Sequence, residues 1–267
     1  MSVSAGRPVV LVIGGSDPTG ASGIQADLRH LAALGVHGAA VPTAMTSQTM
    51  DGVASVRVVD PDAFRADLDA VRKTLDVSAV VVGMLGDAAI AREAMLWMHA
   101  FYGPVILDPV LASSSGASLL DDAGRVLLRD LLVPRALMVC PNLDELAWLS
   151  GAGRLAVDDA SRIEQAERVL DRGCECVVAK GGHAGGAESV DLLVDDAGVE
   201  RLVAPRVPGV FRGTGGAFAA AAAAACARGM DARAAARFAH AVVAAALRDA
   251  SAAGTPMLAL KDAPATP

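Results

Sequence analysis

Aromatic residues and lysines are scarce in this sequence, and it contains no long uninterrupted hydrophobic run. Phe, Trp and Tyr make up 3% of the 267 residues although 53% are hydrophobic, and only three lysines (Lys73, Lys180 and Lys261) accompany twenty arginines. The longest apolar run, Ala217 to Ala227, is mostly alanine and falls short of the ~18–20 residues that a membrane-spanning helix needs. A transmembrane protein is therefore not expected, despite a mean hydropathy of +0.44.

Charge and the N-terminal sequence narrow the class of protein further. The 23 basic and 30 acidic residues give a net charge of −7, which disfavours a nucleic-acid surface. A local nest of N–H groups can still bind nucleotide phosphates on an acidic protein. The apolar run Val9 to Ile13 is too short for a signal-peptide core of ~7–15 residues. We expect a soluble cytoplasmic protein with neither membrane nor nucleic acid as a partner.

Cysteines are few, and their spacing does not favour metal binding or redox chemistry. The four cysteines (Cys140, Cys174, Cys176 and Cys226) form no Cys-x-x-Cys pair and no cluster with zinc spacing. Cys174 and Cys176 would point the same way if both lay on one strand. We expect all four to be small buried hydrophobic residues.

Short apolar runs alternate with helical patterns along the chain. Six runs rich in β-branched residues predict strands: Pro8–Ile13, His37–Met45, Ala79–Val82, Pro104–Leu107, Ala136–Val139 and Cys174–Ala179. The segments Ser189–Val194 and Val199–Val207 predict an antiparallel pair turning at Asp195–Gly198. Strand–helix alternation favours a mostly parallel sheet covered on both faces. We therefore predict a single α/β domain.

Helix boundaries are marked by capping residues. Asp60 is a predicted cap with Pro61 at the first position, and Phe64, Leu68, Val71 and Leu75 recur on one face. Ser161 and Glu164 predict a capping box in the helix that ends before Gly173. Gly229 is expected to end an alanine-rich helix, and Asp231 to cap the next one.

The first of four candidate functional motifs is the glycine-rich segment Gly14 to Gly23, between a strand and the predicted helix Ile24–Leu34. Glycines let a backbone approach a ligand, and a helix N-terminus favours anions. A dinucleotide site is disfavoured, because the spacing is not Gly-x-Gly-x-x-Gly and His37–Met45 carries no acidic residue. A purely structural tight loop remains an alternative.

The second motif, Cys140 to Glu145, joins a strand to a helix. Asn142 is a natural helix cap, and Glu145 in the first turn suits the helix dipole without any further role. The functional alternative places both residues beside a Mg²⁺–phosphate group at the carboxyl edge of the sheet. The sequence leaves both interpretations open.

The third motif is Lys180-Gly181-Gly182-His183, after an apolar strand. An ammonium group there could neutralise a phosphoryl group in transfer, although a plain surface lysine is the alternative. A Walker A loop is excluded, because no Gly-Lys-Ser or Gly-Lys-Thr occurs.

The fourth motif is Gly213-Thr214-Gly215-Gly216, which leads into the predicted helix Ala217–Arg228. Successive glycine N–H groups at a helix start form a concavity that binds anions. Such a nest would stabilise the charge on a γ-phosphoryl group in flight. The alternative is a simple glycine turn that enters a helix.

Together and in this order, the motifs resemble those of the hydroxymethylpyrimidine and phosphomethylpyrimidine kinases of thiamine biosynthesis, within the ribokinase-like superfamily. The likeness covers roughly residues 8–250, and Gly15 to Leu28 is its most specific stretch. Further matching segments are Thr43-Ala44 with Gln48, Gly83-Met84-Leu85, Leu107-Asp108-Pro109-Val110, Pro141-Asn142-Leu143 with Glu145, and Lys180 to His183. The resemblance implies a three-layer α/β/α sandwich over residues 1–261, with a frayed tail at 262–267.

The resemblance also implies a role for each matching residue. Gln48 would recognise the pyrimidine edge, and the rest of the substrate site would be Gly14, Asp17, Gly83, Met84 and Val110. Asp108 and Glu145 would organise Mg²⁺, directly or through water. ATP phosphates would be held by Asn142, Lys180 and Thr214, and Gly213 and Gly215 would supply the anion hole. A homodimer is implied as well.

The departures from the family pattern fall in its chemistry. The anion-hole motif of the family resembles Thr-His-Gly-Thr-Gly-Cys, and its cysteine is taken as the base toward the substrate hydroxyl. This chain has Phe211-Arg212 before the glycines and Gly216 at the base position. Arg212 either adds transition-state charge stabilisation or points into solvent. Ser114 and Ala117 replace a family lysine and aspartate, and Met257–Pro267 lacks the family's glycine- and proline-rich tail.

Two classes of function therefore remain. General-base assistance contributes ~10²–10⁴-fold, but phosphoryl transfer relies mostly on positioning and electrostatics. The first class is an ATP- and Mg²⁺-dependent kinase of hydroxymethylpyrimidine or its monophosphate, impaired by Gly216, with Asp17 as the nearest acidic substitute for the base. The second is an inactive family member that binds a pyrimidine, a pyridoxal-like compound or a nucleotide. A pyridoxal kinase-like enzyme is a closer variant of the first.

Overall fold

A computed structural model describes residues 6–113, 115–182 and 186–261 of this protein. Three of the positions singled out above lie outside the described residues: Ser114, His183 and the expected tail at 262–267. No helix in the described part of the chain is long and apolar enough to cross a membrane.

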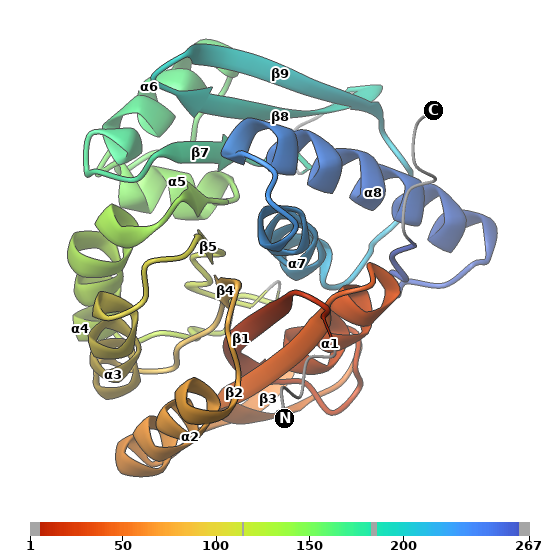
Figure 1. Ribbon diagram of the computed structural model, residues 1–267. Helices are drawn as coiled ribbons and strands as arrows, with labels where there is room; N and C mark the ends of the chain where they lie inside the picture. The colour runs from red at the N-terminus through yellow and green to blue at the C-terminus, as the bar shows by residue number, and fades with distance from the viewer. Residues whose placement is uncertain (1–5, 114, 183–185, 262–267) are drawn as a thin grey trace.

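One sheet forms the centre of the molecule (Figure 1). Within the described residues its nine strands run in the order β3-β2-β1-β4-β5-β6-β7-β8-β9. The neighbours from β2 to β7 are parallel, whereas β3, β8 and β9 are antiparallel to the strands beside them. The strands are β1 (Val9–Ser16), β2 (His37–Gln48), β3 (Val53–Val58), β4 (Ala79–Val82), β5 (Val105–Leu107), β6 (Met138–Val139), β7 (Cys176–Ala179), β8 (Glu188–Asp195) and β9 (Gly198–Pro205).

Helices cover both faces of this sheet, as the strand–helix alternation predicts. One face packs against α1 (Gly23–Ala33), α7 (Thr214–Ala227) and α8 (Ala232–Ala252). The other packs against α2 (Pro61–Thr74), α3 (Ala88–His99), α4 (Asp122–Leu127), α5 (Leu143–Leu149) and α6 (Asp159–Leu170), with a π-helical turn at Leu128–Leu132 and a 3₁₀ turn at Val133–Arg135. The predicted mostly parallel α/β fold is therefore confirmed.

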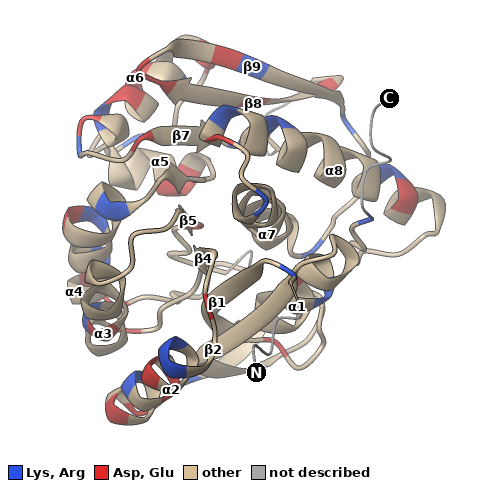
Figure 2. Ribbon diagram, viewed as in Figure 1, with Lys and Arg blue, Asp and Glu red and all other residues tan. Residues whose placement is uncertain are grey.

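The central helix α7 is buried on all sides. Its residues Ala217 to Ala225 have essentially no exposed surface, and they pack against α1, α8 and the strands β1, β4 and β5. A helix that is apolar all round is expected only in such a position. In Figure 2 the ribbon positions of Lys, Arg, Asp and Glu gather on the outer helices, and the ribbon of α7 carries almost none of them. This burial fixes the N-terminus of α7 against the carboxyl edge of the sheet.

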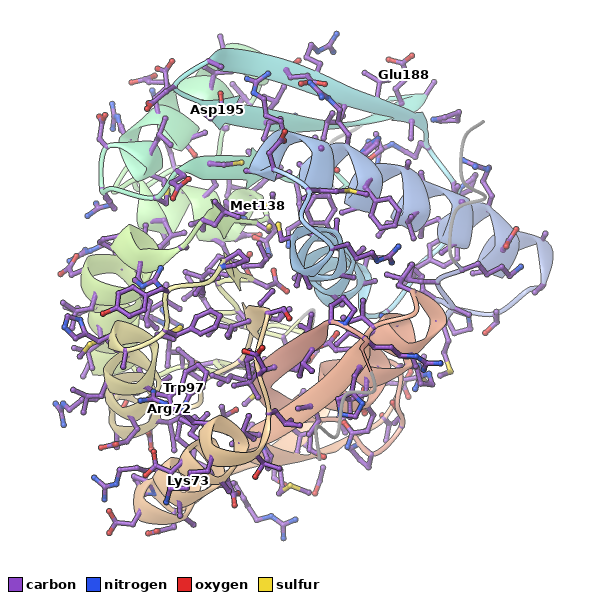
Figure 3. All side chains as sticks on the ribbon, in the orientation of Figure 1. Arg72, Lys73, Trp97, Met138, Glu188 and Asp195 are labelled. Carbon is purple, nitrogen blue, oxygen red and sulfur yellow. The ribbon has the colours of Figure 1, made fainter. Side chains whose placement is uncertain are left out.

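Helix caps agree with most of the predictions from sequence. Asp60 caps α2, Asp231 caps α8, and Gly229 follows α7 with φ +92°. On the opposite face of the sheet, the Arg72 guanidinium lies 4.9 Å from the ring centroid of Trp97 and joins α2 to α3 (Figure 3). These contacts stabilise the scaffold and lie apart from the carboxyl edge.

Two local predictions were wrong. The capping box of α6 is formed by Asp158 and Ser161, so Ser161 is the third helical residue and not the cap, and Glu164 takes no part. Asp158 captures the free N–H of Ser161 because it stands before the first turn.

The second wrong prediction is the start of β7, which was expected at Cys174 and lies at Cys176. Cys174 precedes the strand and packs on the α6 side, whereas Cys176 lies on the strand and packs on the α7 side. All four cysteines are buried and free, as expected.

The edge strand β3 was not predicted from sequence. Its residues are half-buried or exposed, and it pairs antiparallel with the end of β2. With β3 alongside, β2 runs to Gln48, beyond its predicted end at Met45. A strand without a buried face carries a weak hydrophobic pattern, which explains why the sequence did not reveal it.

Candidate active site

The loop after β1 is held together by the carboxylate of Asp17. Its two oxygens accept hydrogen bonds from the backbone N–H and hydroxyl groups of Thr19 and Ser22, at 2.7–2.9 Å. Burial alone would raise the pKa of Asp17, but hydrogen bonds from Thr19, Gln48 and Ser22 lower it below its usual value. A carboxylate satisfied in this way is a poor proton acceptor. The structure therefore corrects the suggestion that Asp17 replaces the missing base.

The predicted walls of the substrate site meet at the carboxyl ends of β1 and β4. The N–H of Gly83 donates to the Ile13 carbonyl at 2.9 Å, and Gly14 lies against Ile24. Met84 packs with Val110 in a small hydrophobic cluster, and its carbonyl accepts from the Thr43 hydroxyl at 2.6 Å. These contacts bring the predicted ring-binding residues to one edge of the sheet.

Gln48 lines a cavity of about 470 Å³ on the same edge. Its other lining residues come from the ends of β1 and β2 and from β3, and they include Ser16, Pro18, Met45 and Arg57. Because the Gln48 side chain bonds to Asp17 and Asp17 bonds to Ser22, this cavity is linked directly to the loop that precedes α1. The loop in turn contacts the start of α7.

The start of α7 is a group of free backbone donors. Gly213 is the cap in a left-handed conformation, with φ +72°, and a side chain there would overlap the carbonyl oxygen of Ala21. The first backbone bond of the helix runs from the N–H of Ala217 to Gly213, so the N–H groups of Thr214, Gly215 and Gly216 have no partner within the helix. No side chain caps this end. These free donors in the first turn of α7 lie where the sequence predicts the anion nest.

Lys180 lies directly beside this nest. Its Nζ donates to Asp108 Oδ1 at 2.8 Å, and a Cβ on Gly215 would lie 3.0 Å from that Nζ and 3.1 Å from Asp108 Oδ2. Burial would lower the pKa of Lys180, but the carboxylates of Asp108 and Glu145 raise it above its usual value. With 17% of its side chain exposed, Lys180 is a permanently charged group at the site and not a plain surface lysine.

Asn142 and Glu145 form a reciprocal capping box at the start of α5. Asn142 Oδ1 accepts the Glu145 N–H at 2.9 Å, and Glu145 Oε2 accepts the Asn142 N–H at 2.8 Å. Burial raises the pKa of Glu145 to about 7; Lys180 opposes this shift and Asp108 adds to it. The capping interpretation is therefore confirmed, and the cap also places a buried carboxylate near Lys180 and Asp108. The place of both residues beside a Mg²⁺–phosphate group stays a prediction.

These carboxylates can be tested for a fit to Mg²⁺. Among the described residues, no three His, Cys, Asp or Glu side chains gather closely enough to enclose a metal ion. Mg²⁺ commonly uses only one or two carboxylates and completes its shell with water and substrate phosphates. Asp108 and Glu145 fit this requirement, since the Asp108 carboxylate adds to the raised pKa of Glu145 and a cation would relieve that repulsion.

Sequence reasoning missed the support behind Lys180. The N–H of Gly181 donates to Asp191 Oδ1 at 2.8 Å, and the other oxygen of Asp191 bonds to His240 Nδ1 at 2.9 Å. A side chain on Gly181 would overlap the Val190 carbonyl oxygen. Asp191 lies in the predicted strand Ser189–Val194, and a carboxylate among apolar residues was the signal that could have marked it. The pair fixes the backbone that carries Lys180.

A second missed residue is Asp27, which is 7% exposed on the inner face of α1. A Cβ on Gly216 would lie 3.0 Å from Asp27 Oδ1. An acidic residue one turn before Leu31 on a buried helix face was the available signal.

Comparison with known proteins points to one family. A family model described as phosphomethylpyrimidine kinase matches residues 17–260. A hydroxymethylpyrimidine/phosphomethylpyrimidine kinase from Rhizobium meliloti is 40% identical over 246 residues, which cover 90% of this chain and 92% of that protein.

Solved structures show the same arrangement of the chain. A phosphomethylpyrimidine kinase from Clostridium difficile has a TM-score of 0.79 at 28% identity and covers 90% of this chain and 100% of its own. A pyridoxal kinase from Staphylococcus aureus, in complex with AMP-PCP and pyridoxal, has a TM-score of 0.83 at 29% identity and covers 91% of this chain and 89% of its own.

Proposed function

This chain belongs to the phosphomethylpyrimidine kinase family, and from that membership we propose that its carboxyl-edge site phosphorylates hydroxymethylpyrimidine and then its monophosphate, with ATP as the donor. The observation that carries the proposal is the meeting of Lys180 with the free N–H groups at the start of α7. Backbone donors and a buried ammonium group, held in advance, stabilise the charge of a transferring phosphoryl group.

Each part of the site has a separate task in this proposal. The N–H groups of Thr214, Gly215 and Gly216 hold the γ-phosphoryl oxygens, and Lys180 neutralises the charge that develops on them. Burial of α7 keeps these donors in place, so they need no rearrangement during the reaction. Gln48 orients the ring from the β2 side, where its cavity opens.

Asp108 and Glu145 are the residues that would hold Mg²⁺. The ion, when bound, neutralises phosphate charge and orients the transferring group. Lys180 already bonds to Asp108, so the ammonium group and the carboxylates form one charge-balanced cluster. The homodimer remains a prediction from the family likeness.

The nearest rival acceptor is pyridoxal, because a pyridoxal kinase shares the fold over most of this chain. The second rival is an inactive binding protein, which the glycine at position 216 motivates. Gln48 lines an open cavity of about 470 Å³ at the ends of β1 and β2, which supports a small ring as ligand. One assay distinguishes a pyrimidine kinase, a pyridoxal kinase and an inactive binding protein.

ADP release is measured with purified protein, ATP and Mg²⁺, with hydroxymethylpyrimidine, its monophosphate or pyridoxal as the acceptor. We expect ADP only when an acceptor is present, and faster release with the pyrimidines than with pyridoxal. Lys180→Met is expected to lower kcat by about 10²-fold or more, since it removes a preorganised charge from the transition state.

Lys73→Met is the matched control, because Lys73 is exposed on α2, away from the carboxyl edge (Figure 3). Its kcat should equal that of the unchanged protein. Faster release with pyridoxal than with either pyrimidine would assign the activity to the rival acceptor. Ligand binding by calorimetry without any ADP would identify a binding protein and contradict the proposal.

A further inference from the structure

One carboxylate at the carboxyl edge is left without a partner. The other acidic side chains there are engaged: Asp17 with Thr19 and Ser22, Asp108 with Lys180, Glu145 with the Asn142 N–H, and Asp191 with Gly181 and His240. Asp27 differs, because its Oδ1 is buried and has no hydrogen-bond partner among the described residues. A buried carboxylate oxygen without a hydrogen bond costs free energy of folding, so the presence of an aspartate at this position points to a functional role.

Asp27 lies against the glycines at the start of α7. A Cβ atom on Gly216 would lie 3.0 Å from Asp27 Oδ1, 3.8 Å from its Cγ and 4.0 Å from its Oδ2. A Cβ atom on the neighbouring Gly215 would instead lie 3.0 Å from Lys180 Nζ and 3.1 Å from Asp108 Oδ2. Adjacent Cα atoms are only about 3.8 Å apart. Asp27 therefore lies against the first turn of α7, one residue along from the position that faces Lys180 and Asp108.

No side chain at position 216 packs on this buried carboxylate. Any side chain at that position would press on Asp27 Oδ1, since 3.0 Å is shorter than an ordinary contact between carbon and oxygen. The absence of a side chain and the unpaired oxygen therefore occur at the same place. The unpaired oxygen therefore faces the backbone of the first turn of α7.

We propose that Asp27 is the general base that accepts the proton of the substrate hydroxyl in the first phosphorylation. The proposal rests on the kinase function proposed above. In this step the substrate O–H bond breaks and its proton moves to the Asp27 carboxylate. The hydroxyl oxygen bonds to the γ-phosphorus, the bond from that phosphorus to the bridging oxygen breaks, and ADP leaves with the electron pair. Asp27 then returns the proton to solvent.

The electrostatic surroundings of Asp27 suit this role. Burial and the nearby Asp108 carboxylate raise the pKa of Asp27 to about 7, against a smaller opposing effect of Arg29. His30 lies on the same face of α1, and Lys180 belongs to the cluster on the α7 side. A base with a pKa near the working pH is the most effective kind.

The second phosphorylation gives an internal control, because its acceptor differs chemically. A hydroxyl group must lose its proton during the transfer. A phosphate monoester has a second pKa near ~6 and is already deprotonated at pH 8. Loss of a general base therefore slows the first step and spares the second, whereas a structural defect slows both.

The test compares Asp27→Asn with the unchanged protein at pH 8, with hydroxymethylpyrimidine and its monophosphate as separate acceptors. We expect kcat for the hydroxyl acceptor to fall by about 10²-fold or more, and kcat for the phosphate acceptor to change by less than about threefold. Asp231→Asn is the matched control, because it alters an exposed cap at the far end of α7 and asparagine also caps helices well. It should change neither rate.

A pH profile keeps the test informative if Asp27→Asn does not fold. For the unchanged protein, kcat/KM for the hydroxyl acceptor should fall below about pH 7, following the ionisation of Asp27. If the variant folds, this acid limb should be absent from it. A profile that is flat between pH 5.5 and 8.5, or equal losses with both acceptors, would overturn the role of Asp27 as a base.

Failure of this inference and failure of the proposed function give different results. If the unchanged protein is inactive with the hydroxyl acceptor and Gly216→Cys is active, the site is a kinase site and Asp27 is not its base. If neither protein turns over any acceptor, the kinase function itself is wrong and the role of Asp27 falls with it.

Discussion

Asp17 and Asp27 flank the first turn of α1, and their carboxylates are in opposite electrostatic situations. Asp17 accepts four hydrogen bonds within its own loop, and its pKa is lowered. Asp27 has a buried oxygen without a partner among the described residues, and its pKa is raised. Residue type alone does not separate the two, because hydrogen bonding and burial decide which carboxylate can accept a proton.

This difference makes a prediction about stability. The pKa of Asp27 is about 7 in the folded protein and near ~3.9 in an unfolded chain. Between these values the folded state binds the extra proton, so the stabilising effect of Asp27 is present at low pH and is lost as the pH rises through about 7. The asparagine in Asp27→Asn cannot ionise, so the variant does not lose this unfolding free energy as the pH rises.

Urea unfolding at pH 5 and pH 8 measures the effect. Relative to the unchanged protein, Asp27→Asn should gain about 2–3 kcal/mol of unfolding free energy between the two pH values. The corresponding difference for Asp231→Asn should stay constant, because that side chain is exposed. A constant difference for Asp27→Asn as well would show that its carboxylate is not held in the environment described.

Among the helices and strands, α7 contributes most to the site. Its alanine-rich sequence forms a helix readily, and the small side chains let α1, α8 and the sheet approach it closely. The glycine at each end has a left-handed backbone: Gly213 with φ +72° and Gly229 with φ +92°. Only the first of these glycines also lies against another segment, at Ala21.

Matched substitutions at the two ends of α7 separate backbone strain from function. Gly229→Ala should cost about 1–2 kcal/mol of stability from its backbone conformation alone and leave kcat unchanged. Gly213→Ala should cost more, because its methyl group would also overlap the Ala21 carbonyl. It should lower kcat/KM for ATP by at least about tenfold, through displaced N–H donors. Thermal unfolding and steady-state kinetics check both variants, and equal kinetics would contradict a role for the nest.

The sequence predicted those elements whose hydrophobic pattern is strong. The parallel strands and the caps Asp60, Asn142 and Asp231 were all predicted from short-range signals. Predictions failed where neighbouring residues compete for one capping position, or where a strand has no buried face. Asp158 took the capping position expected for Ser161, and the edge strand β3 has no fully buried residue.

For the whole molecule, the order of the motifs along the chain resembles that of one family and predicts one site at the carboxyl edge, which stays a prediction. Contacts link Gln48 to Asp17, Asp17 to Ser22, and the same loop to Gly213. The buried pairings behind the site could not be predicted, because Lys180 with Asp108 and Asp191 with His240 join residues far apart in sequence. These pairs form only when the chain has folded and brings the sheet and α8 together.

The most direct test of this account is phosphorus NMR of the reaction products formed from hydroxymethylpyrimidine, ATP and Mg²⁺. If the nest at Gly213 and the cavity at Gln48 serve one reaction, a phosphomonoester signal should grow in step with ADP. A diphosphate ester should follow, and little inorganic phosphate should form. ATP hydrolysis to inorganic phosphate at the same rate with and without the pyrimidine would contradict the account, as would unchanged ATP.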